Sequence, residues 1–168
     1  MSSSISDYRG TEITSDEMRS GRYLLESYRT TLRYAWTAGV ATGRFLEGMK
    51  NGIIWGRRCD LCGRTMVPPR MYCESCFRPT DSWVRLKDTG KVVTYSVSYV
   101  NADASRRKEP IIVAVIEIDG ASPLVGILHL IGGVEPSKVR VGMSVKAAWK
   151  PRNRRTGAIT DIRHFKPI

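Results

Sequence analysis

The pattern of hydrophobic and polar positions changes along the chain, and its first part has the period of a helix. In SDEMRSGRYLLESYRTTLRYAW, Leu24 and Leu25, Tyr28 and Leu32 recur at three- and four-residue intervals, so they form one apolar face. Ser15, followed by two acidic residues, is typical of a helix start. This aromatic-rich face needs a surface to pack on, either in the later part of the chain or on another chain.

A second helical stretch, RFLEGMKNG, ends at Asn51-Gly52, a pair that is common where helices stop. Between the two stretches lies TAGVATG, in which Gly39 and Gly43 have a small-x-x-x-small spacing. This segment is either a surface for close helix packing or a simple break between two helices. We therefore expect residues 1–52 to form a helical N-terminal extension.

Residues 53–83 hold every cysteine of the chain, as two Cys-x-x-Cys pairs in CDLCGRTMVPPRMYCESC. The segment is too short to bury a useful core, so a bound metal must supply its folding free energy. Pro68-Pro69 favours an extended turn that brings the two pairs together. Four sulfur atoms fill a tetrahedral site and leave no position for water or substrate, which makes the site structural. Zinc suits this spacing best, and iron can substitute for it. The predicted ligands are Cys59, Cys62, Cys73 and Cys76.

From residue 84 onward the pattern has the period of β-strands. In KVVTYSVSYV, apolar residues alternate with Thr and Ser, which predicts one buried face made of Val93, Tyr95, Val97 and Tyr99. IIVAVIEI is almost continuously apolar, as for a strand that is covered on both faces. Three more strands are predicted in PLVGILHLI, SVKAAWK and AITDIRHF. The segments NADASRRKEP, DG and PRNRRTG separate some of the strands as turns or loops.

Five short strands favour a small closed barrel, and the oligonucleotide/oligosaccharide-binding (OB) barrel fits best. An SH3-like barrel or a small open sandwich is the alternative. The predicted fold class is therefore mainly β with N-terminal helices. Its predicted domains are an N-terminal helical extension (1–52), a rubredoxin-like zinc ribbon (53–83) and a five-stranded OB-fold barrel (84–168).

The net charge of +11 is concentrated after residue 56. Residues 57–87 carry 7 basic and 3 acidic side chains, and residues 88–168 carry 13 and 7. Such an excess attracts polyanions, whether nucleic acid, nucleotide phosphates or an acidic protein surface, or is simply an unselective basic surface. No apolar run is long enough to cross a membrane, and the N-terminus lacks the pattern of a signal peptide. We expect a cytoplasmic protein with no membrane partner.

The sequence offers few catalytic groups once the cysteines bind a metal. His129 lies in an apolar strand, His164 lies near the C-terminus, and the acids Glu117 and Asp119 flank a turn. No nucleophile elbow, phosphate loop or dinucleotide motif is found. We therefore expect a binding protein rather than an enzyme.

Nucleic acid is the first alternative ligand, because a zinc ribbon and an OB barrel with basic excess are typical of nucleic-acid modules. Such proteins usually place aromatic residues among the basic ones for base stacking. The basic loop 150–155 contains no aromatic residue, although Trp149 precedes it. The loop could equally contact phosphate or protein, or be a solvated hairpin tip, so nucleic acid is kept as the alternative partner.

The order of motifs resembles a known family. FLEGMKNGIIWGRRC, then CDLCG, PPR, CESC and TGKVVTYSVSYV, and the closing VGMSVKAAWKPRNRRTGAITDIRHFKPI are similar to the zinc-ribbon/OB-fold family of acyl-CoA-associated, thiolase-accessory proteins. The resemblance covers the chain from about residue 28 to its end. It is closest to the type that scaffolds archaeal complexes of acetoacetyl-CoA thiolase and 3-hydroxy-3-methylglutaryl-CoA (HMG-CoA) synthase in the mevalonate route.

This resemblance implies a non-catalytic accessory subunit of CoA-dependent acyltransferases. It implies thiolase as a partner, HMG-CoA synthase as a second one, and CoA or acyl-CoA as a ligand. It also carries the metal-ligand role over to the four cysteines. Arginine forks suit the phosphates of CoA or the carboxylates of a partner protein. The candidate residues for such contacts are Arg57, Arg58, Arg64 and Arg70.

Overall fold

The computed structural model describes residues 12–23, 31, 33 and 35–168, and the chain divides into two compact units, Met1–Trp36 and Thr37–Ile168. In the first unit, α1 (Ser15–Arg19) begins where the sequence predicted it. Its cap is Thr14, whose side chain accepts a hydrogen bond from the Glu17 N–H while the Glu17 carboxylate accepts one from the Thr14 N–H. The predicted apolar face of Leu24, Tyr28 and Leu32 lies outside the described residues.

In the second unit, α2 (Gly39–Asn51) packs against the sheets that follow it. The helix starts at Gly39, so the predicted break in TAGVATG ends there and Gly43 lies inside a continuous helix. As predicted, it stops at Asn51, because Gly52 adopts a left-handed conformation with φ 72°. The buried face of α2 consists of Ala41, Phe45, Gly48 and Met49.

The metal-binding module is built on a small antiparallel sheet with the strand order β2-β1-β3. Its strands are β1 (Ile54–Arg58), β2 (Thr65–Met66) and β3 (Ser82–Leu86). Since Ile54 pairs with Leu86 and Arg58 with Ser82, β3 follows β1 along its whole length. This sheet therefore continues three residues past residue 83, where the sequence placed the domain boundary.

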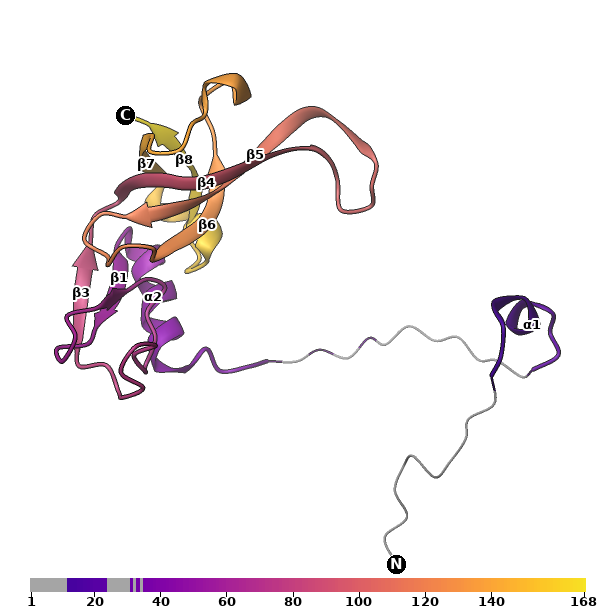
Figure 1. Cartoon of the computed structure of the whole chain (residues 1–168), viewed down its shortest axis with the longest axis horizontal. Coiled ribbons are helices and arrows are strands. Elements are labelled where there is room, and N and C mark those ends of the chain that lie inside the picture. Colours follow the sequence, from indigo (N-terminus) through magenta and orange to yellow (C-terminus); the bar gives the residue numbers. More distant parts are fainter. Residues whose placement is uncertain (1–11, 24–30, 32, 34) are drawn as a thin grey trace, which may run out of the picture. The chain divides into compact units, whose positions relative to one another are not determined.

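The remaining strands form a closed five-stranded barrel in the order β4-β5-β6-β8-β7, which confirms the predicted OB fold (Figure 1). All pairs are antiparallel except β6 with β8, which meet in parallel at Ile131 and Phe165. The strands are β4 (Thr89–Val100), β5 (Arg106–Ile118), β6 (Gly126–Ile131), β7 (Ser144–Trp149) and β8 (Ile162–Pro167). Short 3₁₀ turns occur at η2 (Pro136–Lys138), η3 (Arg152–Arg154) and η4 (Ile159–Asp161).

One hydrophobic core joins the helix, the small sheet and the barrel. Phe45 and Met49 of α2 and Ile54 of β1 belong to the same buried cluster as the barrel interior, which includes Ile116 and Phe165. The metal-binding module is thus fixed to the barrel by shared apolar contacts.

The first two barrel strands differ from the prediction. They continue beyond the barrel as a two-stranded arm, residues 98–111, which projects to the right of the barrel in Figure 1. The predicted loop NADASRRKEP is a turn only in its first half, because β5 begins at Arg106. The predicted buried face is wrong at Tyr95 and Tyr99, which are 37% and 58% exposed. On β5 only alternate residues, such as Ile112 and Ile116, are fully buried, so the strand is not covered on both faces.

Candidate metal centre and its neighbours

The four cysteines predicted as metal ligands come together in the structure. Their sulfur atoms all lie within 4.8 Å of one another, and the Sγ atoms of Cys62 and Cys73 are 3.6 Å apart. Cys59 and Cys73 are buried, whereas the other two are more accessible. Four sulfur donors suit a tetrahedral zinc or iron ion with no open coordination position, so the donor set fits a structural metal.

Two tight turns, or knuckles, present the sulfur atoms with the same backbone pattern. In the first knuckle, the Gly63 N–H donates to the Cys59 carbonyl at 2.8 Å. In the second, the Phe77 N–H donates to the Cys73 carbonyl at 2.9 Å. The residue after each pair therefore adopts a left-handed conformation, with φ 73° at Gly63 and 52° at Phe77. This conformation costs a residue with a Cβ roughly 1–2 kcal/mol, a cost that glycine avoids.

Neighbouring groups shift the pKa of two of the four thiols in opposite directions. Backbone N–H groups of Cys76 and Ser75 lower the pKa of Cys73 to about 7. The neighbouring Cys62 thiol, followed by burial, raises the pKa of Cys76 to about 12. Four thiolates so close together repel one another, so full deprotonation needs a cation among them. A divalent metal supplies that charge.

The cysteine cluster is held against the barrel as well as within its own sheet. Met66 is buried against Cys59 and Cys73, and Val125, which precedes β6, packs against the same cluster. The backbone of Thr65 pairs with Ser122, because the Ser122 N–H donates to the Thr65 carbonyl at 2.9 Å. The knuckles are therefore anchored to the turn that connects β5 and β6.

Arg57 is buried and bonded inside the protein. Its side chain is 7% exposed, and its guanidinium donates to the Thr80 hydroxyl at 2.9 Å and to the Thr80 carbonyl. The guanidinium also lies over the indole of Trp83, 4.8 Å from the ring centroid. In this position Arg57 joins β1 to the segment that follows the second knuckle.

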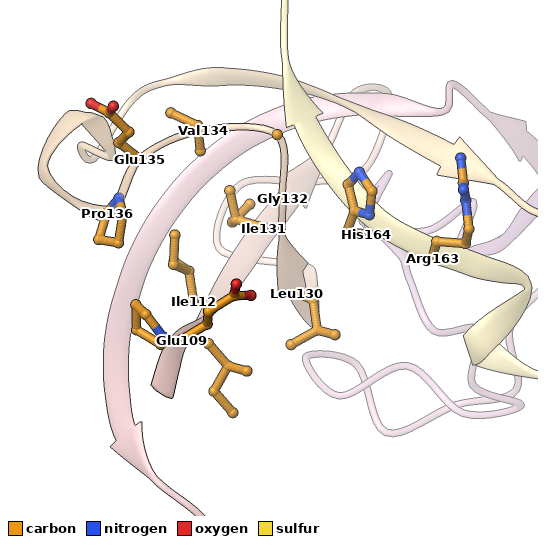
Figure 2. Close-up of a pocket in the computed structure, with 13 residues that line it drawn as sticks. Glu109, Ile112, Leu130, Ile131, Gly132, Val134, Glu135, Pro136, Arg163 and His164 are labelled. Atoms are coloured by element: carbon orange, nitrogen blue, oxygen red, sulfur yellow. The ribbon is translucent and has the colours of Figure 1, made fainter. Parts of the chain in front are cut away.

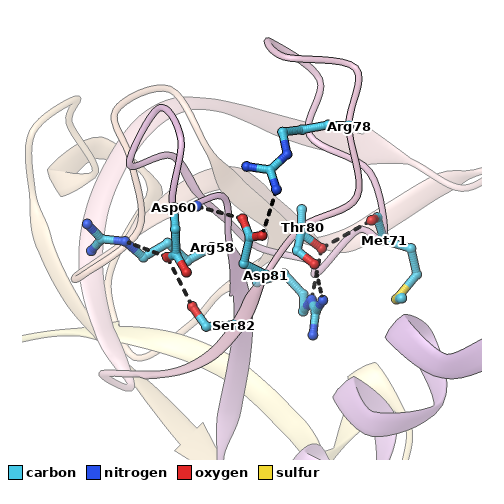
Figure 3. Close-up of polar contacts among 8 residues, drawn as sticks. Arg58, Asp60, Met71, Arg78, Thr80, Asp81 and Ser82 are labelled. Carbon is cyan, nitrogen blue, oxygen red and sulfur yellow. Dashed lines mark hydrogen bonds and ion pairs between the residues drawn. The ribbon is translucent and has the colours of Figure 1, made fainter.

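The other three predicted arginines lie at the surface of the module in ion pairs. Arg64 and Arg70 both contact the Glu74 carboxylate, at 2.5 and 2.6 Å, and Arg58 lies 3.6 Å from Asp60. Figure 3 shows the neighbouring polar contacts, in which Asp81 accepts hydrogen bonds from the Arg78 guanidinium and the Asp60 N–H. The exposed side-chain fraction is 51% for Arg58 and 61% for Arg70, so these two remain open to a ligand.

A stacked cation that the sequence analysis did not identify joins α2 to this sheet. Arg44 lies over two indoles, 4.7 Å from the ring centroid of Trp55 and 4.6 Å from that of Trp83. Cation–π contacts of this kind stabilise packing between elements. The sequence signal for this contact is a pair of tryptophans that β1 and β3 bring together. It can be recognised once the pairing of these two strands is known.

The basic loop 150–155 is tied down by a buried carboxylate. Asp161 has no exposed surface, and its carboxylate accepts hydrogen bonds from the N–H groups of Thr156, Gly157 and Ala158. Burial alone would raise its pKa, but these three donors and Lys150 lower it below the usual value. Arg155 lies over the Trp149 ring at 5.2 Å and donates to the Lys150 carbonyl.

The two histidines have structural surroundings, as the sequence indicated. The His129 Nδ1 accepts a hydrogen bond from the Leu130 N–H, so Nε2 carries the hydrogen and donates to the Ile159 carbonyl. His164 lines a pocket of about 660 Å³, together with Arg163 of β8, Leu130 and Ile131 of β6, and Ile112 of β5 (Figure 2). Burial and the nearby Arg163 lower the pKa of His164, which is therefore mainly neutral at pH 7.

No helix within the described ranges is long and apolar enough to cross a membrane.

Comparisons with known proteins match both halves of this architecture. Residues 47–82 match the rubredoxin-like zinc ribbon domain of ChsH2, and residues 83–150 match the C-terminal OB-fold domain of ChsH2. The chain is 34% identical over 116 residues to a DUF35 domain-containing scaffold protein of Methanocaldococcus jannaschii, covering 67% of this chain and 80% of that protein. A DUF35 domain-containing scaffold protein from Methanothermobacter thermautotrophicus is 26% identical over 116 residues. That match covers 68% of this chain and 83% of that protein.

Two solved structures share the fold. A DUF35 family protein of unknown function from Sulfolobus solfataricus has a TM-score of 0.55 and 32% identity, covering 65% of this chain and 78% of that chain. A chain of the Ltp2-ChsH2(DUF35) aldolase has the same TM-score of 0.55 and 21% identity. The match covers 83% of this chain and 98% of that chain. The resemblance predicted from the sequence motifs is thus confirmed, and the chain belongs to the DUF35 family of zinc-ribbon and OB-fold scaffold proteins.

Proposed function

We propose that this protein is a non-catalytic scaffold subunit of a CoA-dependent enzyme complex in the cytoplasm. The carrying observation is that two archaeal relatives, which this chain matches over 80% and 83% of their lengths, are named scaffold proteins. The core supports this proposal, because it joins the metal-binding module and the barrel into one body that can present fixed surfaces to other proteins.

Zinc is the metal that we propose for the four cysteines, with iron as a substitute. The closed sulfur set offers no position for a substrate, so the ion holds the two knuckles together. The catalysis of the complex would then belong to the enzymes that this subunit binds.

The proposed partners are a thiolase and, bridged to it, HMG-CoA synthase, and the proposed small-molecule ligand is CoA or acyl-CoA. Arg58, Arg64 and Arg70 are the side chains that we assign to phosphates or to acidic groups of a partner. Arg64 and Arg70 share one carboxylate in the free protein, and a phosphate group could compete for the same guanidinium groups. Arg57 supports this surface from inside, through Thr80.

The decisive experiment is capture of the tagged full-length chain from its source cell at low salt, followed by identification of the bound enzymes. Metal analysis and an absorption spectrum of the purified protein distinguish colourless zinc from coloured iron. We expect a thiolase in near-stoichiometric amount and about one zinc per chain. Recovery of the chain without any CoA-dependent enzyme would contradict the proposal.

Nucleic-acid binding is the second candidate, and the arm favours it. Tyr99 of β4 is 58% exposed, and β5 carries Arg106, Arg107 and Lys108 opposite it along the arm. An aromatic side chain beside basic ones is the arrangement that binds single strands. Titration with a fluorescent single-stranded oligonucleotide at several salt concentrations tests this. Tight binding that weakens steeply with salt would favour this candidate over the scaffold.

A further inference from the structure

Phe77 occupies a position where a large apolar side chain does not help the folded chain. Its backbone is held at φ 52° by the second knuckle, and its side chain is 86% exposed. The first knuckle places Gly63 at the equivalent position, with φ 73° and the same hydrogen bond. A phenylalanine in the left-handed region is strained, and this one gains almost no burial in return.

Leu124, in the turn between β5 and β6, repeats this combination. Its φ is 62° and its side chain is 85% exposed, while the Glu117 carboxylate accepts a hydrogen bond from its N–H at 2.8 Å. The next residue, Val125, packs against the cysteine cluster, as does Cys76, which precedes Phe77. Two strained and exposed apolar side chains therefore each follow or precede a residue that packs against the same small cluster.

The surroundings of Phe77 have the composition of a protein interface. Tyr72, 64% exposed, forms a bridge with Pro79 across the second knuckle, and Met71 is 37% exposed. Arg70 and Arg78 lie beside them in exposed ion pairs. Aromatic residues, methionine and arginine are the residue types that are enriched in the centres of protein–protein interfaces.

We propose that Phe77 of the metal-binding module and Leu124 of the β5–β6 turn are the anchor side chains by which this part of the protein docks onto its partner enzyme, each entering an apolar recess with an acidic rim. This inference rests on the proposed scaffold function and names the surface that performs it. The metal is then what holds Phe77 in its exposed conformation, because the knuckle that imposes φ 52° is closed by the sulfur ligands.

The charges of the module indicate a protein partner with an acidic rim. Residues 57–87 carry 7 basic and 3 acidic side chains, so a second copy of the same surface would be repelled. A nucleic acid would be attracted by the arginines, but Leu124 offers no ring on which a base could stack. An apolar recess bordered by carboxylates matches both the anchors and the arginines around them.

The test uses the full-length, zinc-loaded chain and the thiolase that capture identifies, purified separately. The variants are Phe77→Gly and Leu124→Gly, and the control is Val141→Ala, which removes an apolar side chain that is 64% exposed before β7. Affinity is measured by calorimetry, with zinc content and Tm measured for each variant. We expect each glycine variant to keep its zinc and its Tm, or to gain in Tm, and to bind the enzyme at least about tenfold more weakly. Val141→Ala should bind like the unmodified protein.

Four results would overturn the proposal. Glycine variants that bind the enzyme within about twofold of the unmodified chain would leave the scaffold function intact but show that the anchors lie elsewhere. A fall in Tm in Phe77→Gly would show that this side chain packs within the chain. Self-association of the unmodified chain that Phe77→Gly abolishes would make a second copy the occupant. If the unmodified chain binds no thiolase, the proposed function fails and this inference fails with it.

Discussion

Gly48 of α2 lies directly against the indole of Trp55 on β1. A Cβ on Gly48 would come within 2.5 Å of the Trp55 Cδ1 atom and 2.7 Å of the Ile53 carbonyl oxygen. The missing side chain is thus what lets the helix approach the metal-binding module. The close approach also positions Arg44, one turn earlier on α2, over the rings of Trp55 and Trp83.

We predict that Gly48→Ala destabilises the protein, because the added methyl group meets a backbone oxygen that cannot move without shifting the strand. The expected loss is about 1–3 kcal/mol in the free energy of unfolding. Gly43→Ala in the same helix is the matched control, since its Cβ would meet nothing within 4 Å. That change should raise stability by roughly 0.5–1 kcal/mol. Urea unfolding followed by tryptophan fluorescence measures both, and equal effects of the two changes would contradict the packing described here.

Removal of a ligand should unfold the metal-binding module. Cys73→Ser takes away a buried sulfur atom, so we expect loss of the metal and a lower Tm. Ser75→Ala, an exposed position between Cys73 and Cys76, is the control and should keep the metal. Thiolate ligands must be deprotonated, so acid should release the metal from the unmodified protein as the sulfur atoms take up protons. Metal content after gel filtration at several pH values measures this, and full retention by Cys73→Ser would refute the ligand assignment.

The sequence predicted the parts of this structure that depend on local pattern. The Cys-x-x-Cys spacing indicated the metal cluster, and short alternating or continuous apolar runs indicated the strands, because each signal lies within a few consecutive residues. The arm could not be predicted in this way. The Tyr95 to Tyr99 stretch alternates like a buried strand, yet β7 pairs with β4 only at Thr89 to Lys91, so the outer half of β4 leaves the barrel.

The role of Phe77 was also hidden in the sequence. In the sequence, a phenylalanine after a Cys-x-x-Cys pair is simply an apolar residue. Its positive φ and its exposure are seen only in the geometry of the knuckle. The arginine prediction had the same weakness. Composition placed four arginines near the cysteines, but only the pairing of β1 with β3 showed that Arg57 lies against Trp83 inside the module.

Asp161 should make stability depend on pH in the acid range. Its hydrogen bonds lower its pKa in the folded protein below the ordinary value of 3.8 for an aspartate. The unfolded chain then takes up the proton first, so this contribution is fully present above about pH 4 and is lost as the pH falls through the folded pKa. We expect Asp161→Asn to cost about 1–3 kcal/mol at pH 7, because three backbone N–H groups lose an ionised acceptor.

The measurement is urea unfolding of both proteins at pH 7 and at decreasing pH. The difference in stability between the unmodified chain and Asp161→Asn should shrink in acid. Glu135→Gln is the control, because its ion pair with Lys138 is about two-thirds exposed and contributes at most about 1 kcal/mol. A constant difference across the acid range would show that the Asp161 charge does not stabilise the loop.

Substitution of the four predicted arginines should separate a structural role from a binding role. Arg57→Met removes the donors to Thr80, so we expect a loss of about 1–3 kcal/mol in the free energy of unfolding. Arg58→Met and Arg70→Met replace exposed side chains and should change stability by less than about 1 kcal/mol. If these two arginines contact CoA phosphates or partner carboxylates, both variants should weaken CoA binding or partner binding, measured by calorimetry with the purified enzyme. A stable Arg57→Met protein with weakened binding would reverse the assignment and place Arg57, despite its burial, in the binding surface.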